Sequence, residues 1–154
     1  IHQMTCPREL HFRDGKLWQT PIRELQQLRE EAQNWHGNAA SAPALDAGRL
    51  EFELKTDAAL KVNLANMLWL SLDEKGIRLE RKSLRNDEIL TRYWDGKVSS
   101  LRVLCDSSSV EIFINEGEGV MSSRYFPDHP AQIRFEGASV ITLRYWSLRA
   151  SMIE

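Results

Sequence analysis

From residue 49 to residue 148 the chain alternates apolar and polar positions with a period of two. Residues 50–55 read Leu-Glu-Phe-Glu-Leu-Lys and residues 60–64 read Leu-Lys-Val-Asn-Leu. This alternation is typical of antiparallel strands with one buried face. Further strands are predicted at residues 68–72, 77–79, 101–105, 110–115, 123–126, 132–136 and 140–148.

The first thirty residues show a different pattern. Apolar residues flank Asp14-Gly15, and an Asp-Gly pair between such runs favours a type I′ turn, so residues 9–19 predict a β-hairpin. Thr20-Pro21 resembles a helix start, and the apolar spacing that follows predicts a short amphipathic helix through Glu31. Residues 34–48 lack periodicity and predict a connector or an extended entry into the next unit.

Short strands separated by glycine-marked turns favour a sandwich or barrel over helical and alternating β/α folds. We therefore predict an all-β fold, an antiparallel two-sheet β-sandwich of the concanavalin-like kind, preceded by a β-hairpin and a short linker helix. The predicted division is residues 1–33 for the hairpin and linker helix and residues 34–154 for the sandwich.

Composition excludes several function classes. The 154 residues carry a net charge of -2, so there is no basic excess for nucleic acid or for an anionic bilayer. Cys6 and Cys105 are far apart and form neither a disulfide framework nor a zinc motif, which favours a reducing cytoplasm. Because Ile1 opens directly on a strand-like segment, we interpret the chain as a piece of a longer polypeptide.

Candidate catalytic groups have weak support. Asp106 and Glu111 are two carboxylates close in sequence, but they have opposite strand parity and a turn of three serines separates them. We predict a turn-forming Asp106 and an outward or locally paired Glu111. The triple serine lacks the glycines of a nucleophile elbow, and the four histidines form no zinc motif. The sequence thus predicts no catalytic, cofactor-binding or metal-binding residue.

Tryptophans offer one alternative kind of site. Five are present, and their flat faces can stack on sugar rings, although large aromatic side chains more often fill cores and interfaces. Trp35 and Trp94 lie beside loop or turn residues, and they are the candidates for sugar stacking.

Two blocks of the sequence resemble glycoside hydrolase family 32, the invertases and sucrose-6-phosphate hydrolases. The first is Gln-Met-Thr-Cys-Pro-Arg-Glu-Leu at residues 3–10, with Asp-Gly-Lys-Leu at 14–17 and Gln-Thr-Pro-Ile-Arg-Glu-Leu at 19–25. The second is Asp-Ser-Ser-Ser-Val-Glu-Ile-Phe-Ile-Asn at 106–115, with Ser-Ser-Arg-Tyr-Phe-Pro at 122–127. Their order is that of the family's segment after the catalytic region.

The resemblance implies an upstream five-bladed catalytic propeller in the same polypeptide, which cleaves sucrose or sucrose 6-phosphate by the retaining route without metal or organic cofactor. The family's catalytic motifs, Asn-Asp-Pro-Asn, Arg-Asp-Pro and Glu-Cys, are absent from these 154 residues. The resemblance therefore implies a non-catalytic sandwich that supports the propeller and contributes to dimer contacts in some members.

The hairpin resembles the end of the propeller, so its apolar residues should need cover from the sandwich or from a second copy of the chain. These residues are Leu10, Phe12, Leu17 and Trp18. Two alternatives stay open: a carbohydrate-binding module for fructan or sucrose, and a free-standing lectin-like protein.

Overall fold

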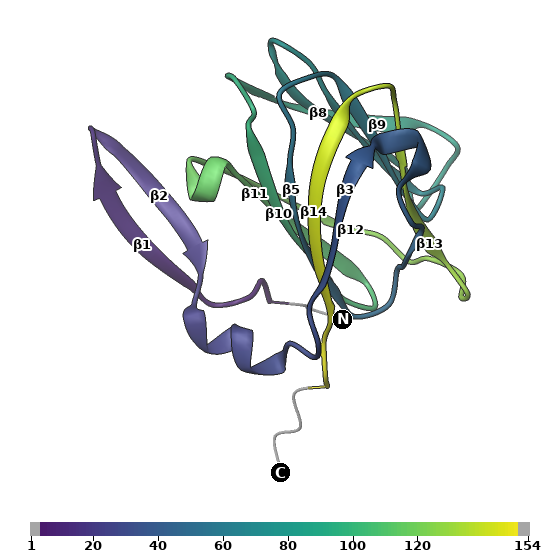
Figure 1. Cartoon of the computed structure of the whole chain (residues 1–154), viewed down its shortest axis with the longest axis horizontal. Helices are drawn as coiled ribbons and strands as arrows, with labels where there is room; N and C mark the ends of the chain where they lie inside the picture. The colour runs from purple at the N-terminus through teal and green to yellow at the C-terminus, as the bar shows by residue number, and fades with distance from the viewer. Residues whose placement is uncertain (1–3, 151–154) are drawn as a thin grey trace.

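A computed structural model describes residues 4–150 and contains two six-stranded antiparallel sheets packed face to face, with a separate hairpin beside them (Figure 1). Sheet I has the order β12 (Gly119–Arg124), β11 (Ser109–Ile114), β10 (Ser100–Cys105), β5 (Leu50–Lys55), β14 (Val140–Ser147) and β3 (Gln33–Asn38). Sheet II has the order β4 (Leu45–Asp46), β13 (Gln132–Glu136), β6 (Leu60–Leu64), β7 (Leu68–Leu72), β8 (Gly76–Lys82) and β9 (Ile89–Asp95). The predicted fold class is confirmed.

The core lies between the two sheets and follows from the alternation. In β5 the apolar residues Leu50, Phe52 and Leu54 point inward and are buried. Phe52 meets Phe135 of sheet II edge to face, with ring centroids 5.8 Å apart. Burial of each such side chain contributes about 1.5–3 kcal/mol, so the paired inner faces supply the main stabilisation of the sandwich.

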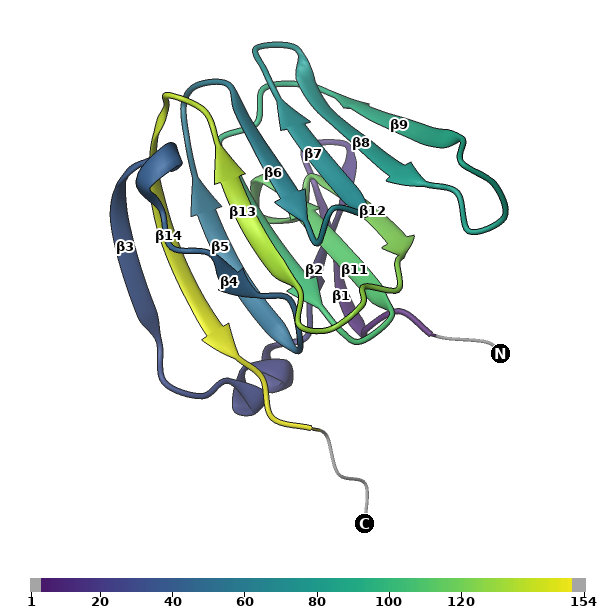
Figure 2. The same cartoon turned by 90° about the vertical axis from the view of Figure 1, so that its right-hand side faces the viewer.

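One edge of the sandwich is closed by an indole ring. β9 and β12 are edge strands of opposite sheets, and they lie on the same side of the molecule (Figure 2). Trp94 of β9 reaches across to β12, where a Cβ atom on Gly119 would lie only 2.3 Å from the Trp94 Nε1 atom. Only glycine allows this approach, so the two edges are locked together at this point.

The hairpin of β1 (Arg8–Arg13) and β2 (Lys16–Pro21) forms its own two-stranded sheet. Arg13 pairs with Lys16, so Asp14 and Gly15 are the whole loop, and both have positive φ as a type I′ turn requires. The predicted hairpin is confirmed, and its tip extends away from the sandwich (Figure 1).

The predicted linker helix differs from the structure. Pro21 ends β2, and a short 3-10 helix, η1 (Arg23–Leu28), replaces the amphipathic helix expected through Glu31. The helix stops because Arg29 has an extended backbone and forms a β-bridge with Leu148. Tertiary pairing therefore overrides the helical spacing.

The predicted connector at residues 34–48 contains regular structure. β3 pairs along β14, from Tyr145 opposite Gln33 to Val140 opposite Asn38, and it is followed by η2 (Ala39–Ser41) and by β4. As an edge strand β3 is mostly exposed, so it carries almost no apolar alternation. The strand expected at 123–126 begins earlier, at Gly119, after η3 (Asn115–Gly117). In the part of the chain that the structure describes, no helix is long and apolar enough to span a bilayer.

Candidate functional site

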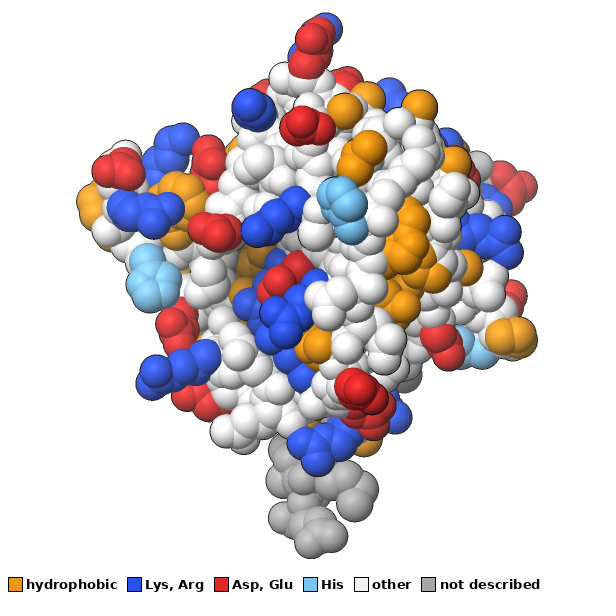
Figure 3. All heavy atoms as spheres, viewed as in Figure 1, with side chains coloured by type: hydrophobic (Ala, Val, Ile, Leu, Met, Phe, Trp, Pro, Cys, Tyr) orange, Lys and Arg blue, Asp and Glu red, His pale blue; other side chains and the backbone are white. Residues whose placement is uncertain are grey.

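The outer face of sheet I differs from a simple solvent-exposed sheet face, because several residues that alternate outward on it are buried. They are Glu51, Glu111, Phe113 and Trp146. The hairpin and η1 lie over this face, and basic and acidic side chains gather where it is hollowed (Figure 3). Sheet I is thus buried on its inner side and, around these four residues, on its outer side as well.

Glu51 is the centre of the buried charges. Its side chain is 0 % exposed. Arg29 donates to both carboxylate oxygens, from Nε to Oε2 at 2.9 Å and from Nη2 to Oε1 at 2.5 Å, and the Nε atom of Arg102 donates to Oε1 at 2.6 Å. A buried carboxylate needs such partners because burial without them costs several kcal/mol. Three segments of the chain therefore meet at one side chain.

Arg29 is held by more than this ion pair. Its guanidinium lies 3.8 Å from the ring centroid of Trp146, and its Nη2 atom lies 3.5 Å from Glu53. Burial acts to lower the pKa of Arg29, but the hydrogen bond and charge of Glu51, with the charge of Glu53, raise it overall. Arg29 therefore stays charged and fixes the chain where η1 ends.

Glu111 makes a second anchor, between β11 and the segment before the hairpin. Its Oε1 atom accepts from Arg8 Nη2 at 2.6 Å, and its Oε2 atom accepts from the backbone N–H of Cys6 at 2.8 Å. Arg8 also donates to Ser122 and lies over the ring of Phe113. The start of β1 is thereby tied to sheet I.

The other strand of the hairpin contacts η3. A Cβ atom on Gly117, which has φ +108, would lie 2.3 Å from the carbonyl oxygen of Gln19 in β2. Only glycine permits both this φ and this approach. Nearby, Lys16 and Glu118 form an exposed ion pair at 3.4 Å. The hairpin is thus held by polar and backbone contacts along its inner side.

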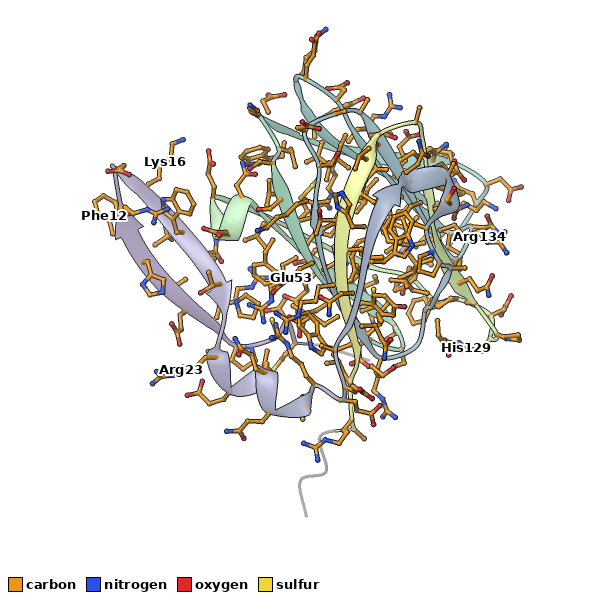
Figure 4. The ribbon with its side chains drawn as sticks, in the orientation of Figure 1. Phe12, Lys16, Arg23, Glu53, His129 and Arg134 are labelled. Carbon is orange, nitrogen blue, oxygen red and sulfur yellow. The ribbon has the colours of Figure 1, made fainter. Side chains whose placement is uncertain are left out.

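The apolar side chains of the hairpin are left uncovered by the sandwich. Leu10, Phe12 and Leu17 are 61 %, 79 % and 51 % exposed. Trp18 is half-buried, with the Arg13 guanidinium 3.9 Å from its ring centroid. Phe12 lies at the outer end of the hairpin, well away from Glu53 at the centre of the face (Figure 4). The predicted apolar surface is therefore present, and within this chain the sandwich does not cover it.

Between the hairpin and sheet I lies a hollow of about 290 Å³. Its walls include Thr20 and Pro21 from β2 and Glu53, Arg102 and Phe113 from sheet I. The hollow offers mixed polar and apolar walls on a face built from packed strands. Such a surface suits contact with another folded unit.

The carboxylates considered for catalysis have structural roles. Asp106 accepts from the backbone N–H of Ser107 at 2.7 Å, so the turn-forming interpretation is confirmed. Glu111 does alternate outward from the core, as one form of the prediction had it, but it is buried and pairs with a residue 103 positions away, so local pairing is wrong. Both residues line a hollow of about 370 Å³, but each Glu111 oxygen already accepts a hydrogen bond, which leaves a fixed ion pair in place of a reactive acid.

The two sugar-stacking candidates are separated. Trp35 lies on β3, at one edge of sheet I, and Trp94 lies on β9, at the far edge of sheet II. Both are half-buried and pack against the core, with Trp94 held between Gly96 and Gly119. They therefore form no joint platform, and sugar stacking at either one stays a prediction.

The remaining candidate groups are potential metal ligands and the two cysteine thiols. Among residues 4–150, no group of three or more His, Cys, Asp or Glu side chains is placed to hold a metal ion. His2 lies outside the described residues. Both cysteines are free thiols, Cys105 in the core and Cys6 half-buried beside Glu111.

The geometry defines a class of protein: a two-sheet β-sandwich with a hairpin and buried ion pairs on the outer face of one sheet. Residues 82–147 match the family model of the glycosyl hydrolases family 32 C terminal. The whole chain is 51 % identical to the sucrose-6-phosphate hydrolase of Salmonella typhimurium and 47 % identical to that of Klebsiella pneumoniae, and it spans 32 % of each. The sucrose-6-phosphate hydrolase structure from Lactobacillus gasseri superimposes with a TM-score of 0.78 at 24 % identity, over 94 % of this chain and 33 % of that one.

The chain belongs to glycoside hydrolase family 32, and it corresponds to the C-terminal, non-catalytic domain of the family's members. It spans about a third of the length of the relatives that it matches. The family resemblance stated from the sequence is therefore confirmed.

The Glu51 network makes a first prediction. Glu51→Gln leaves two arginines with a neutral partner in a buried site, and we expect it to lower the free energy of unfolding by about 3–5 kcal/mol. Glu53→Gln, on the same strand and face but partly exposed, should cost less than about 1 kcal/mol. Urea denaturation of both variants measures the difference, and equal losses would contradict the central role of Glu51.

The thiols make a second prediction. Burial raises the pKa of Cys105 to about 12, and burial with the nearby Glu111 charge raises the pKa of Cys6 to about 12. Since the unfolded thiols ionise near 9.0, the folded state keeps these protons longer, and stability should fall as the pH rises from about 9 to about 12. Comparing wild type with Cys105→Ala by thermal denaturation isolates the Cys105 part. A constant difference across this pH range would refute it.

Proposed function

We propose that this domain supports a catalytic unit of the same polypeptide, which hydrolyses the β-fructofuranosidic bond of sucrose 6-phosphate or sucrose. The relatives named sucrose-6-phosphate hydrolase support this substrate class. In this proposal residues 1–33 complete the catalytic propeller and link it to the sandwich of residues 34–154. The hairpin would then pack as part of the catalytic unit, although in sequence it leads directly into the sandwich.

The observation that carries the proposal is the hairpin itself. It is tied to sheet I by Arg8–Glu111 and by the contact between Gln19 and Gly117, while Leu10, Phe12 and Leu17 remain exposed to solvent. Three large apolar side chains on one isolated two-stranded ribbon are typical of a surface that another unit covers. In our proposal the catalytic unit that precedes this domain in the polypeptide covers these side chains. A second copy of the chain is the alternative.

The chemistry proposed for the parent enzyme supports a cytoplasmic location, which is part of the same proposal. A phosphorylated disaccharide is charged and crosses a bilayer poorly, so the enzyme that cleaves it should share the compartment in which it was phosphorylated. The free thiols of Cys6 and Cys105 agree with a reducing compartment.

A third prediction tests the covered hairpin. In the parent enzyme Phe12→Ser should lower the free energy of unfolding by about 3–5 kcal/mol, because it removes a large buried side chain. In the isolated 154-residue chain, where Phe12 is 79 % exposed, the same change should stay within about 0.5 kcal/mol. Thermal denaturation of both forms gives the comparison.

Leu84→Ser is the matched control, since Leu84 is an exposed apolar residue outside the hairpin. It should be near neutral in both forms of the protein. If Phe12→Ser is also neutral in the parent enzyme, the hairpin is not part of that interface. If instead the isolated chain dimerises in size-exclusion chromatography and Phe12→Ser abolishes the dimer, a second copy covers the hairpin.

A fourth prediction concerns the reaction. Two carboxylates of the catalytic unit would act by the retaining route, with one as nucleophile and one as acid and base. The first fructose released by the parent enzyme should then have the β configuration of the substrate. Proton NMR during the first turnovers reads the anomer, and an α product would overturn the retaining assignment.

A further inference from the structure

A second hollow, of about 420 Å³, lies at the edge of the sandwich between β8 and β9 on one side and β11 and β12 on the other. Trp94 closes this edge at Gly119, where β12 begins, and the hollow opens toward the other end of β12, at Ser122, Ser123 and Arg124. Its volume lies in the range of small-molecule sites. It shares Glu111 and Ser122 with the outer face of sheet I, but its arginines Arg81 and Arg92 come from sheet II.

Strand parity places two arginines on the inner side of sheet II. Arg81 follows buried Leu79 by two positions on β8, and Arg92 is the cross-strand partner of Leu79 on β9. Residues that share a face alternate along a strand, so both side chains rise from the face that elsewhere carries the core. Both line the hollow.

Arg81 is in an unusual state for a charged side chain. Its Nη1 atom is buried and has no hydrogen-bond partner among residues 4–150. In the same part of the chain neither Arg81 nor Arg92 is within ion-pair distance of a carboxylate. A buried donor without an acceptor is destabilising, and more so when it is charged. Such a group in the wall of a hollow points to a ligand that supplies the acceptor.

The rest of the wall adds positive charge and hydroxyl groups. Arg124 lies on β12, and Thr91, Ser122 and Ser123 line the same space. The only acid in the lining is Glu111, whose two oxygens accept from Arg8 and from the backbone N–H of Cys6. The hollow therefore has three arginines and no uncommitted carboxylate.

We propose that this hollow binds the phosphate group of a small molecule. A guanidinium offers a planar pair of donors that matches two phosphate oxygens, and the serine and threonine hydroxyls can donate to the remaining oxygens. Inorganic phosphate and a sugar phosphate share this chemistry. The inference does not depend on the catalytic partner proposed above, because every lining residue belongs to this chain.

Titration calorimetry of the 154-residue chain with three probes tests the site. Inorganic phosphate and glucose 6-phosphate should both bind with one-to-one stoichiometry, and sucrose, which has no phosphate, should not. Tighter binding of glucose 6-phosphate would identify the ligand as a sugar phosphate, and equal binding would identify the phosphate group alone. Absence of saturable phosphate binding at millimolar concentrations and low ionic strength would overturn the proposal.

Two variants assign the binding to the hollow. Arg81→Met and Arg92→Met keep an unbranched apolar stem and remove the guanidinium, and each should weaken phosphate binding at least about tenfold. Arg134→Met is the matched control, because Arg134 is an exposed strand arginine of β13, remote from β9 in sheet II (Figure 4). It should bind phosphate as wild type does. Equal weakening in all three variants would show binding to diffuse surface charge and would overturn the site.

The stability of Arg81→Met separates a binding role from a structural one. Removal of an unpartnered buried charge should leave the melting temperature without phosphate unchanged or higher. Phosphate should raise the melting temperature of wild type and leave that of Arg81→Met unmoved. A large drop in the melting temperature of Arg81→Met without phosphate would mean that Arg81 serves the fold, and it would contradict the proposal.

Discussion

The arrangement of the whole chain depends on one buried carboxylate. Glu51 is removed from solvent and accepts hydrogen bonds from Arg29 and Arg102, which lie 22 and 51 positions away. Arg29 stands where η1 ends, and its pairing with Glu51 holds the chain against sheet I just before β3 begins. The place of the hairpin over sheet I follows from the same contact, because η1 connects the two.

The two faces of sheet I are buried by different chemistry. Its inner face meets sheet II through apolar side chains such as Phe52, whereas its outer face meets the N-terminal segment through Glu51 and Glu111. Apolar contact is tolerant of small shifts, and charge-assisted hydrogen bonds are directional. The inner face therefore supplies stability, and the outer face fixes where the hairpin stands.

The sequence predicts elements with strong alternation and misses those without it. The strands that contain Leu50, Val62 and Ile133, and the hairpin turn at Asp14, follow from local pattern and lie where expected. β3 was not predicted as a strand because an edge position leaves it polar. The roles of Glu51 and Glu111 were also missed. Alternation shows which side chains share a face of a strand, but it does not show whether the outward face is exposed to solvent or is covered by another part of the chain. The partners of these two residues are distant in sequence, so no local motif reports them.

Two glycines, Gly117 at the end of η3 and Gly119 at the start of β12, are sites of close approach from two other parts of the molecule. Gly117 is pressed by the backbone of β2, and Gly119, two residues later, receives the ring of Trp94 from β9. Neither position has space for even one added carbon. A larger residue at either position would therefore have to displace β2 of the hairpin or the Trp94 ring of β9, so the sequence tolerance of these two positions is set by two different sheets.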